Sequence, residues 1–564
     1  MNSPLFRKKP IQDALVPDHE SKLHKILSVR DLTALGIAAI IGAGSFSSLG
    51  DACFKGGPGV VLLFVITGIA CGFTALCYAE FASRLPVAGS AYTYAYVSFG
   101  ELAAWIIGWA LLMEYSIGNI YVAFSWSDYF TSMLQRLHIH VPEYLSCSYL
   151  EARKAFENQS VNQELIRAWT GAPQVGGLRI IFDLPAIIIN ILITMLVYVG
   201  VRESRNISNI MVVLKLLVIL LVIAVGAMYI QSGNWMPLND AGVAAFMPNG
   251  FAGVMSAVSG VFFAYIGFDA ISVFAEESKN PQRDLPRGMI YSLVICTVVY
   301  ILLALVLTGV LDYRQFDGIG DPLAYIFEVK NNAWMQLLVS FIAVVAMTSV
   351  LLVFQMGQPR IWMSMSRDGL LPEKFQRIHP KYLTPSFATI VTGLVVGIPI
   401  LFTDKTFVLD FTSIATIFAF VLVCGGILLI PRKEKIPGRF HLKYINGKYL
   451  FPVLVFGCFF IISFLFPGYF SSLLEFDGTD HSLKISSLIY WGLLTILAFA
   501  AFMKELSLIP LLGVASCGYL LTGMSASNWA WFTAWLLVGL VIYLSYGARK
   551  SKLNALGESN RLTD

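Results

Sequence analysis

The sequence predicts an all-α integral membrane protein with about 14 membrane-spanning helices, and three observations support this prediction. Of the 564 residues, 57% are hydrophobic and 13% are charged, and the mean hydropathy is +0.71. Apolar runs of about 20 residues, the length that crosses a bilayer, recur between residues 31 and 547. Most charged residues fall between these runs and are dispersed along the chain, so the net charge of +4 does not indicate a nucleic-acid-binding surface.

Positive charges are shared unequally between alternate loops. Six Lys or Arg residues lie in the segment 1–30 and six more in the loop 431–448, whereas the loop 312–333 holds two. Lys and Arg accumulate in cytoplasmic loops of membrane proteins. The asymmetry therefore predicts a protein of the plasma or bacterial inner membrane with cytoplasmic tails at 1–30 and 548–564.

No cluster of residues indicates an enzyme or a metal site. The 7 His residues lie in tails or loops, and the 8 Cys residues show no CxxC spacing. A catalytic or metal-binding set needs several such groups at one place. We therefore expect no catalytic residue, no metal and no cofactor.

Two apolar segments contain glycine-centred interruptions at membrane depth, at residues 40–46 and 262–268. Unpaired backbone groups are costly in lipid, so a broken helix persists only where the freed groups line a cavity or meet a ligand. Two such breaks at corresponding places in the two halves of a chain are typical of a solute-binding site. The alternative is that these glycines only permit close packing of helices.

Two ionisable residues lie far from the ends of their predicted spans. Lys215 lies in the span 206–230, about 14 Å from its inner end, which is long for a side chain that reaches back to the interface. Loss of hydration favours an uncharged amine, so Lys215 can take up and release a proton. Glu114 lies in the span 92–134, which is long enough to predict strong tilt or a helix that continues past the bilayer. We expect Glu114 to face the interior, either as a contact to a substrate amine or in a structural hydrogen bond.

Several short motifs are spread along the chain, and their combination is more specific than any one of them. They are Gly42-Ala43-Gly44 with Phe46, the stretch 77–92, Gly100-Glu101, Gly108-Trp109, Glu114-Tyr115, the stretch 263–270, the stretch 280–288 and the stretch 367–372. Together they resemble the amino acid–polyamine–organocation superfamily and, within it, the cationic amino acid transporter group. The resemblance covers about residues 30–430 and 506–550. Ser45 and Ala110 depart from the usual pattern of that family, which bears on the choice of substrate.

The resemblance implies a five-plus-five inverted-repeat core with four additional C-terminal transmembrane helices. The first repeat covers 31–230 and includes the outward loop 136–180; the second covers 231–430. The four accessory spans cover 431–547. Within them, the pair at 450–503 is expected to be an insertion.

The directions of the two broken spans predict a clamp for an amino acid. The outer half of the first span begins near Ser45, and a helix N-terminus suits a carboxylate. The backbone N–H groups of Ala43, Gly44 and Ser45, next to Gly42, are expected to donate hydrogen bonds to the carboxylate of the substrate. The expected acceptors for the α-ammonium are the carbonyls of Ile40, Ile41, Phe263, Ala264 and Ile266, beside Gly267. The resemblance also places Glu114 and Met347 at the pocket, Phe263 as a gate over the substrate and Asp269 at the inner gate.

The resemblance implies import of a cationic or small neutral amino acid by alternating access. Lys215 is similar to the lysine of proton-coupled members, whose ammonium takes the place of a sodium ion, so we expect a proton-coupled, sodium-independent transporter. Exchange of one amino acid for another remains an alternative, as does a sensor that does not transport. The expected partners are the amino acid, protons and the lipid bilayer, with no nucleic acid and a monomeric or homodimeric state.

Overall fold

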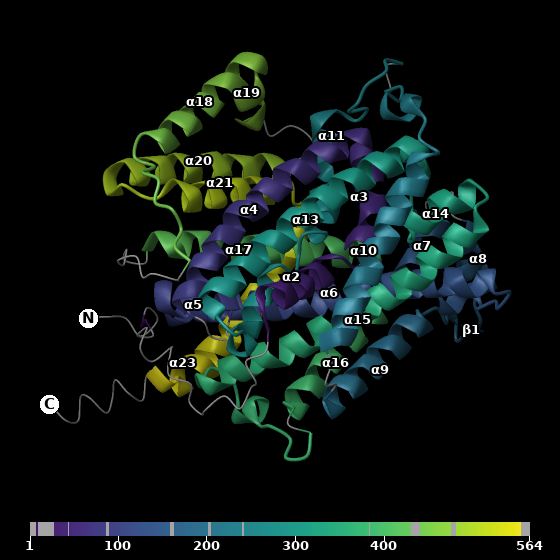
Figure 1. Ribbon diagram of the computed structural model, residues 1–564, viewed down its shortest axis with the longest axis horizontal. Helices are drawn as coiled ribbons and strands as arrows, with labels where there is room; N and C mark the ends of the chain where they lie inside the picture. The colour runs from purple at the N-terminus through teal and green to yellow at the C-terminus, as the bar shows by residue number, and fades with distance from the viewer. Residues whose placement is uncertain are drawn as a thin grey trace.

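The computed structural model of the protein describes most of the chain. The described residues are 7–8, 27–42, 44–85, 90–157, 163–200, 205–239, 242–382, 384–429, 440–474 and 481–553. These residues form a bundle of helices, as the sequence predicts (Figure 1). The all-α class is therefore confirmed, apart from one pair of two-residue strands, β1 (Gln174–Val175) and β2 (Leu178–Arg179).

The helices fall into three groups along the chain. The first half contains α2 (Val29–Ile40), the π-helical turn η2 (Gly44–Ser48), α3 (Leu49–Gly56), η3 (Gly57–Gly59), α4 (Val60–Arg84), α5 (Ser90–Ser98), α6 (Glu101–Arg136), η4 (Glu143–Leu145), α7 (Tyr149–Glu157), α8 (Gln163–Gly171), α9 (Leu184–Val199) and α10 (Arg205–Ala227). The second half contains η5 (Ser232–Trp235), α11 (Gly250–Ser256), α12 (Val258–Phe263), the 3₁₀ helix η6 (Asp269–Glu277), α13 (Pro281–Val310), η7 (Tyr313–Phe316), α14 (Pro322–Val329), α15 (Ala333–Arg367), η8 (Glu373–Gln376), α16 (Ser386–Ile400) and α17 (Lys405–Leu429). The C-terminal part contains α18 (Leu450–Leu465), α19 (Tyr469–Leu474), α20 (His481–Lys504), α21 (Leu508–Thr522), α22 (Ala526–Ile542), the π-helical turn η9 (Tyr543–Gly547) and α23 (Ala548–Lys550).

Many of these helices have the length and composition of membrane spans. Among the described residues, 7 helical segments are long and apolar enough to cross a bilayer, and five more apolar helices have 10–17 residues. Interrupted segments are divided among several elements, so the total of about 14 spans stays a prediction.

The long span predicted at 92–134 is two helices, and the prediction of one continuous helix there is wrong. Helix α5 ends at Ser98, and Gly100 has a positive φ of 106°, a conformation that glycine adopts without strain. Helix α6 then starts at Glu101 and runs for 36 residues, or about 54 Å. It is longer than the hydrocarbon core of about 30 Å, which agrees with the expectation of strong tilt or of a helix that continues past the bilayer.

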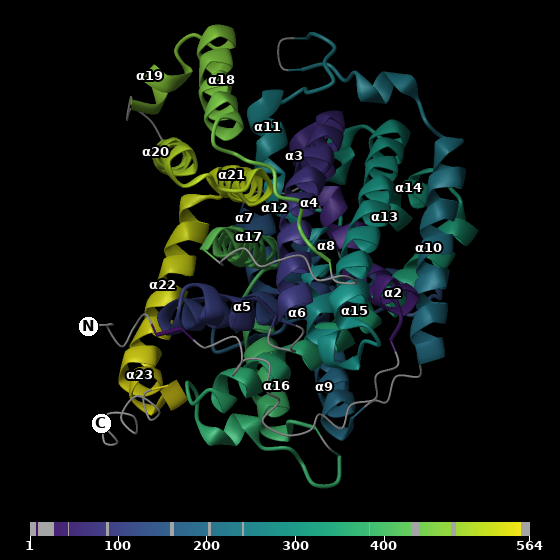
Figure 2. The ribbon, with the colours of Figure 1, turned by 60° about the vertical axis from the view of Figure 1, so that its left-hand side comes forward.

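Helix packing puts α2, α3, α6, α12 and α15 at the centre of the molecule. Helix α6 packs against α15 and α17, and α13 packs against α4 and α2. Helix α10 contacts α2, α13 and α15. Figures 1 and 2 show α18, α19 and α20 at one corner, away from α9 and α16. The central helices are therefore surrounded by other helices, and their polar groups are shielded from lipid.

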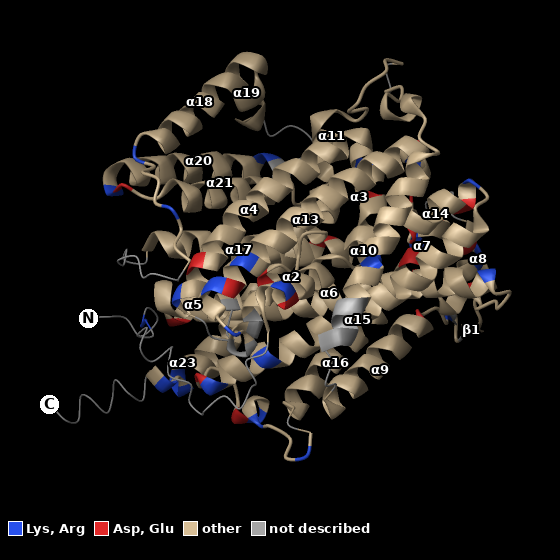
Figure 3. Ribbon diagram, in the orientation of Figure 1, with Lys and Arg blue, Asp and Glu red and all other residues tan. Residues whose placement is uncertain are grey.

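Charged residues lie mainly at the ends of the bundle. Figure 3 shows many Lys and Arg side chains toward the edge where both termini lie, and few on the long helices between the two ends. This distribution agrees with the unequal loop charges in the sequence. The assignment of that edge to the cytoplasm stays a prediction.

Helix α2 begins at a capping box. Ser28 donates to the Asp31 carboxylate through its backbone N–H (2.9 Å) and its hydroxyl (2.6 Å). Just before this cap, Leu27 pairs with Ser278 in an isolated parallel bridge, and the Lys279 N–H donates to the Leu27 carbonyl at 2.9 Å. These contacts join the start of α2 to the segment that follows η6.

Candidate functional site

The first interruption that the sequence predicts is present. Helix α2 ends at Ile40, Ile41 has extended backbone angles (φ −80°, ψ 95°), and the chain resumes as η2 before α3. The Gly42 carbonyl accepts hydrogen bonds from the Ser45 N–H (3.1 Å) and hydroxyl (3.0 Å). Predicted donor Ala43 lies outside the described residues. The break therefore satisfies part of its own backbone polarity, as an environment without water requires.

The second interruption is also present. Helix α12 ends at Phe263, residues 264–268 form turns, and η6 begins at Asp269. Gly267 has a φ of 119°, which an L-residue rarely adopts. The Phe263 carbonyl accepts from the Ile266 N–H at 3.2 Å. Both predicted breaks are therefore real gaps between helices.

The two breaks lie directly against each other. A Cβ atom at Gly44 would lie 2.5 Å from the Cα of Ala264, and one at Gly267 would lie 2.9 Å from the carbonyl carbon of Ala39. Both distances are too short for a real Cβ, and in both cases the obstacle is backbone that cannot easily move. Glycine at these positions is what allows the two broken helices to touch.

A small cavity lies between the breaks. Its volume is about 10 Å³, enough for about one water molecule. The lining residues are Ala39, Ile40, Gly44, Val122, Phe263, Ile266, Val350 and Phe354. The sequence predicts four of them, Ile40, Gly44, Phe263 and Ile266. A cavity of this volume has no room for an amino acid.

Met347 and Glu114, the two predicted pocket residues outside the breaks, do not line this cavity, and neither do Ile41, Gly42, Ser45, Ala264 and Gly267 within the breaks. Met347 is fully buried on α15, but Val350 and Phe354 of the same helix face the cavity instead. Glu114 is 3% exposed, and its Oε2 atom has no hydrogen-bond partner among the described residues. Asp269 is the nearby acidic residue with which Glu114 interacts.

Asp269 is the first residue of η6, the helix that follows the second break. It is 2% exposed, and its carboxylate lies beside the backbone N–H groups of Gly267 and Ala270. Helix η6 runs from Asp269 to the segment that pairs with Leu27. The predicted role of Asp269 at an inner gate stays a prediction.

Two predicted acceptor carbonyls of the first break already have partners in the chain. The Ile40 carbonyl accepts from the Tyr300 hydroxyl at 3.0 Å. The Ile41 carbonyl accepts from Lys215 at 3.5 Å. A bound ammonium would share or displace these contacts, so an opening of the break changes the partners of both carbonyls.

Lys215 connects the first break to α15. Its side chain is 1% exposed, and its Nζ lies 2.5 Å from the Ser349 hydroxyl, 3.4 Å from the Ala38 carbonyl and 3.5 Å from the Ile41 carbonyl. The three donors of an ammonium match these three oxygens. The amine therefore points into the break and does not extend along α10 to the interface, the alternative that the sequence left open.

An aromatic pair closes one side of the cavity. The rings of Phe263 and Tyr121 meet edge to face with centroids 4.5 Å apart. The Lys405 ammonium lies 5.6 Å from the centre of the Tyr121 ring and forms an ion pair with Asp128. Next to the aromatic pair of Phe263 and Tyr121 there is thus a charged layer, formed by Lys405 and Asp128, which the sequence did not predict.

This charged layer also contacts the first broken helix. The Ser47 hydroxyl of η2 donates to the Gly320 carbonyl at 2.9 Å, and Lys405 Nζ lies 3.5 Å from the same oxygen. The Lys405 N–H donates to Glu151 of α7 at 2.9 Å. Helix α7 and Gly320 in the segment 312–333 therefore both contact Lys405 of this charged layer.

A sequence pattern could not reveal most of these partners. Lys405 and Asp128 are 277 residues apart, and Lys215 and Ser349 are 134 residues apart. The only local signal was a charged or polar residue at a helix end or within an apolar run. Such a signal indicates that a partner is needed, not which residue provides it.

Comparisons with known proteins show the family of this chain. The sequence profile of the amino acid permease family matches residues 27–502, and the profile of the C-terminus of amino acid permeases matches residues 506–551. The two profiles together cover nearly all of the described residues.

Several relatives align over almost their whole length. The branched-chain amino acid permease BcaP of Bacillus subtilis is 36% identical, over 98% of this chain and 100% of the relative. The methylthioribose transporter of the same species is 32% identical over the same shares. The vacuolar cationic amino acid transporter 2 of Arabidopsis thaliana is 29% identical, over 97% of this chain and 93% of the relative.

The close approach at Gly44 generates a first prediction. Gly44→Ala should lower the free energy of unfolding by about 1–3 kcal/mol, because the new methyl group would overlap the Ala264 backbone. Thermal melting of the purified protein measures the effect. Gly72→Ala is the control, because a Cβ there meets nothing within 4 Å. Equal melting temperatures for the two variants would show that the breaks do not touch.

Asp321, next to Gly320 in the outer layer, generates a prediction about pH. Loss of hydration raises the pKa of its carboxyl from 3.8 to about 7, and the neighbouring Asp128 and Glu328 add to the rise. The folded protein thus binds this proton more tightly than the unfolded chain does. The contribution of Asp321 to the free energy of unfolding is therefore largest at low pH and declines as the pH rises from about 4 to about 7.

Melting temperatures between pH 5 and pH 8 test this prediction. The melting temperature of the wild type should fall by about 2–4 °C more than that of Asp321→Asn over this range, because the amide does not titrate. Asp317→Asn, at an exposed position of the same segment, should follow the wild type. Parallel curves for the wild type and Asp321→Asn would contradict the assignment.

Proposed function

This chain belongs to the amino acid permease family, and we propose that it imports an amino acid by alternating access, coupled to protons and independent of sodium. The coarser statement, that the chain is an amino acid transporter of the amino acid–polyamine–organocation superfamily, follows from the family match. The observation that carries the finer proposal is the pair of broken helices with Lys215 bound at the first of them.

The clamp for the substrate uses the backbone at both breaks. The π-helical turn that follows the first break begins at Gly44, which lines the cavity, so its N-terminal end faces that space and favours a carboxylate. Helix α12 ends at Phe263 on the opposite wall, so its C-terminal carbonyls favour an ammonium. One amino acid would place its two charged groups between these two helix ends.

The cavity lining supports a neutral aliphatic substrate. The side chains that face it, among them Val122, Ile266, Val350 and Phe354, are apolar. A cationic side chain would need a carboxylate in the wall, and Glu114 does not line the cavity in this conformation. The relative named as a branched-chain amino acid permease is consistent with this choice. We therefore propose leucine, isoleucine or valine as the substrate class.

Proton coupling is assigned to Lys215. When it is protonated, its ammonium holds the carbonyls of Ala38 and Ile41 and the hydroxyl of Ser349, and so fixes the first break against α15. Release of the proton removes one donor and the positive charge, which weakens this contact. The ammonium also fills a place where a bound cation would otherwise meet the same oxygens, which is the basis for sodium independence.

Alternating access would require two seals that open in turn. The outer seal is the Phe263–Tyr121 pair beneath the Lys405–Asp128 ion pair. The inner seal is the pairing of Leu27 with the segment after η6. Both seals are closed here, and the cavity of about 10 Å³ agrees with that state. Each broken helix provides one arm to each seal.

The repeat assignment is part of the same proposal. The first repeat would be 31–230 and begin with the broken pair α2 and α3, and the second would be 231–430 and begin with α12 and η6. In this arrangement the accessory spans 431–547 do not contribute to the cavity, whose lining residues all lie before residue 431. Exchange of amino acids is the alternative within the same fold, and a sensor is the alternative without transport.

Replacement of Lys215 tests the coupling. Lys215→Ala should reduce uptake driven by an imposed pH gradient in proteoliposomes to the level of empty liposomes, because no group then binds the coupling proton. Counterflow of labelled substrate at equal pH should persist. Lys374→Ala, at an exposed position, should transport like the wild type. Full accumulation by Lys215→Ala would refute the coupling role, and gradient-independent uptake by the wild type would favour exchange.

A binding screen tests the substrate class. Leucine, isoleucine and valine should each raise the melting temperature of the purified protein, whereas arginine and lysine should not, because the lining has no charge to pair with them. At about 100 times the dissociation constant, bound ligand adds about 2.7 kcal/mol of stability. A larger shift with arginine than with leucine would contradict the neutral class. Stabilisation without flux in liposomes would instead indicate a sensor.

A further inference from the structure

The loop between α6 and α9 forms a small folded unit at one edge of the bundle. Figure 1 shows α7, α8 and β1 of this loop close together. In its described part, α7 and α8 pack against each other, and the loop has a small core of its own, formed by Cys147, Ala152, Ala168, Ala172 and Ile181. The Ser127 hydroxyl of α6 donates at 2.6 Å to Asp183, which caps α9 and so fixes the far end of the loop. The loop is therefore built to act on its neighbours through defined contacts.

One face of α7 holds the start of α17. Glu151 and Lys154 are three residues apart and lie on the same face of α7. Glu151 accepts from the Lys405 N–H at 2.9 Å, and Lys154 Nζ lies 2.5 Å from Asp404 Oδ2. The other carboxylate oxygen of Asp404 accepts from the Phe407 N–H at 2.8 Å, in the first turn of α17. Helix α7 thus contacts both the backbone and the capping side chain of this helix end.

The Lys154–Asp404 ion pair joins an exposed amine to a buried carboxylate. The side chain of Lys154 is 59% exposed, and that of Asp404 is 4% exposed. The bond to the Phe407 N–H keeps Asp404 at the end of α17, whether or not Lys154 is bound. Lys154 loses little when it returns to water, because an ion pair with a solvated partner contributes about 1 kcal/mol or less. The contact is therefore one that can open and close at low cost.

Lys405 connects this contact to the aromatic gate. Its ammonium, which also forms an ion pair with α6, lies 5.6 Å from the centre of the Tyr121 ring, and that ring meets Phe263. The same ammonium lies 3.5 Å from the Gly320 carbonyl, which also accepts from the Ser47 hydroxyl of η2. A shift of the start of α17 would therefore change contacts with α6 and with the first broken helix.

We propose that α7 is a clamp on the outer seal and that Lys154 is the positioning residue that keeps it closed. The proposal rests on the alternating access of the proposed function. In the closed state Lys154 holds Asp404, and the start of α17 keeps Lys405 against Tyr121. When the cavity opens on the Phe263 side, Lys154 separates from Asp404, which continues to cap α17. The loop between α6 and α9 thus controls how often the site is open to the outer solution.

Labelling of a cysteine in the cavity tests the clamp. Val122 lines the cavity and is 1% exposed, so Val122→Cys should react with a membrane-impermeant methanethiosulfonate only when the seal opens. In intact cells, adding Lys154→Ala should speed this labelling about 2–5-fold, because the lost ion pair holds the closed state. Lys154→Glu should speed it further, because two carboxylates repel, and Lys154→Arg should restore the original rate. The chain without Val122→Cys gives the background of the native cysteines.

Arg153→Ala is the matched control. Arg153 is next to Lys154 in the sequence but pairs with Glu157 of the same helix at 2.8 Å, so this variant should label at the original rate. Equal rates for Lys154→Ala and Arg153→Ala would overturn the proposal. An absence of labelling in every variant would overturn it as well, because an opened seal admits the reagent.

Labelling needs no substrate, so the clamp and the proposed transport can fail separately. Faster labelling of Lys154→Ala together with an absence of leucine uptake by the wild type would contradict transport and support the clamp. The same acceleration in inverted membrane vesicles but not in intact cells would place α7 on the cytoplasmic face and overturn its assignment to the outer seal.

Discussion

The direct contact between two interrupted helices is the constraint on which the rest of the structure depends. Gly44 lies against the backbone of Ala264 in the second break, and Gly267 lies against the backbone of Ala39 at the end of α2, and a side chain has no room at either position. In a bilayer, backbone groups released by such breaks find no water. They are satisfied in this protein by local bonds such as Ser45 to Gly42 and by the Tyr300 hydroxyl on Ile40.

The central contact is supported from two directions. On one side, Lys215 bonds to the carbonyls of Ala38 and Ile41 and to the Ser349 hydroxyl, so one buried amine links the first broken helix to α15. On the other side, aromatic and charged layers from Phe263 to Asp128 close the cavity. Because each layer includes residues from separate helices, movement at the breaks changes the packing of the seals. This coupling between packed elements is what a two-state mechanism requires.

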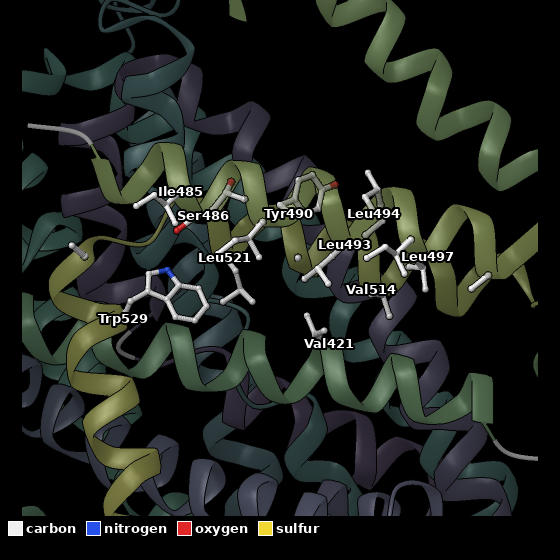
Figure 4. Close-up of a pocket in the computed structure, with 17 residues that line it drawn as sticks. Val421, Ile485, Ser486, Tyr490, Leu493, Leu494, Leu497, Val514, Leu521 and Trp529 are labelled. Atoms are coloured by element: carbon white, nitrogen blue, oxygen red, sulfur yellow. The ribbon is translucent and has the colours of Figure 1, made fainter. Parts of the chain in front are cut away.

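The C-terminal additions serve a different purpose. Helices α18, α20 and α21 form a small core of their own, in which Phe451 packs with Leu494 and Leu511. They leave an apolar groove of about 680 Å³ against α17 (Figure 4), which shares no residue with the cavity between the breaks.

The sequence by itself determined the class of the protein and the positions of its irregularities. Glycines within apolar runs at 40–46 and 262–268 and a lysine at 215 stand out because the bilayer penalises each of them locally. Tertiary structure decided which groups meet. The rotation of α15 turns Val350, and not Met347, toward the cavity, and packing joins Lys405 to Asp128 across 277 residues. A penalty for burying a polar group can be recognised in one segment, but the partner that relieves it is set by how all the helices pack.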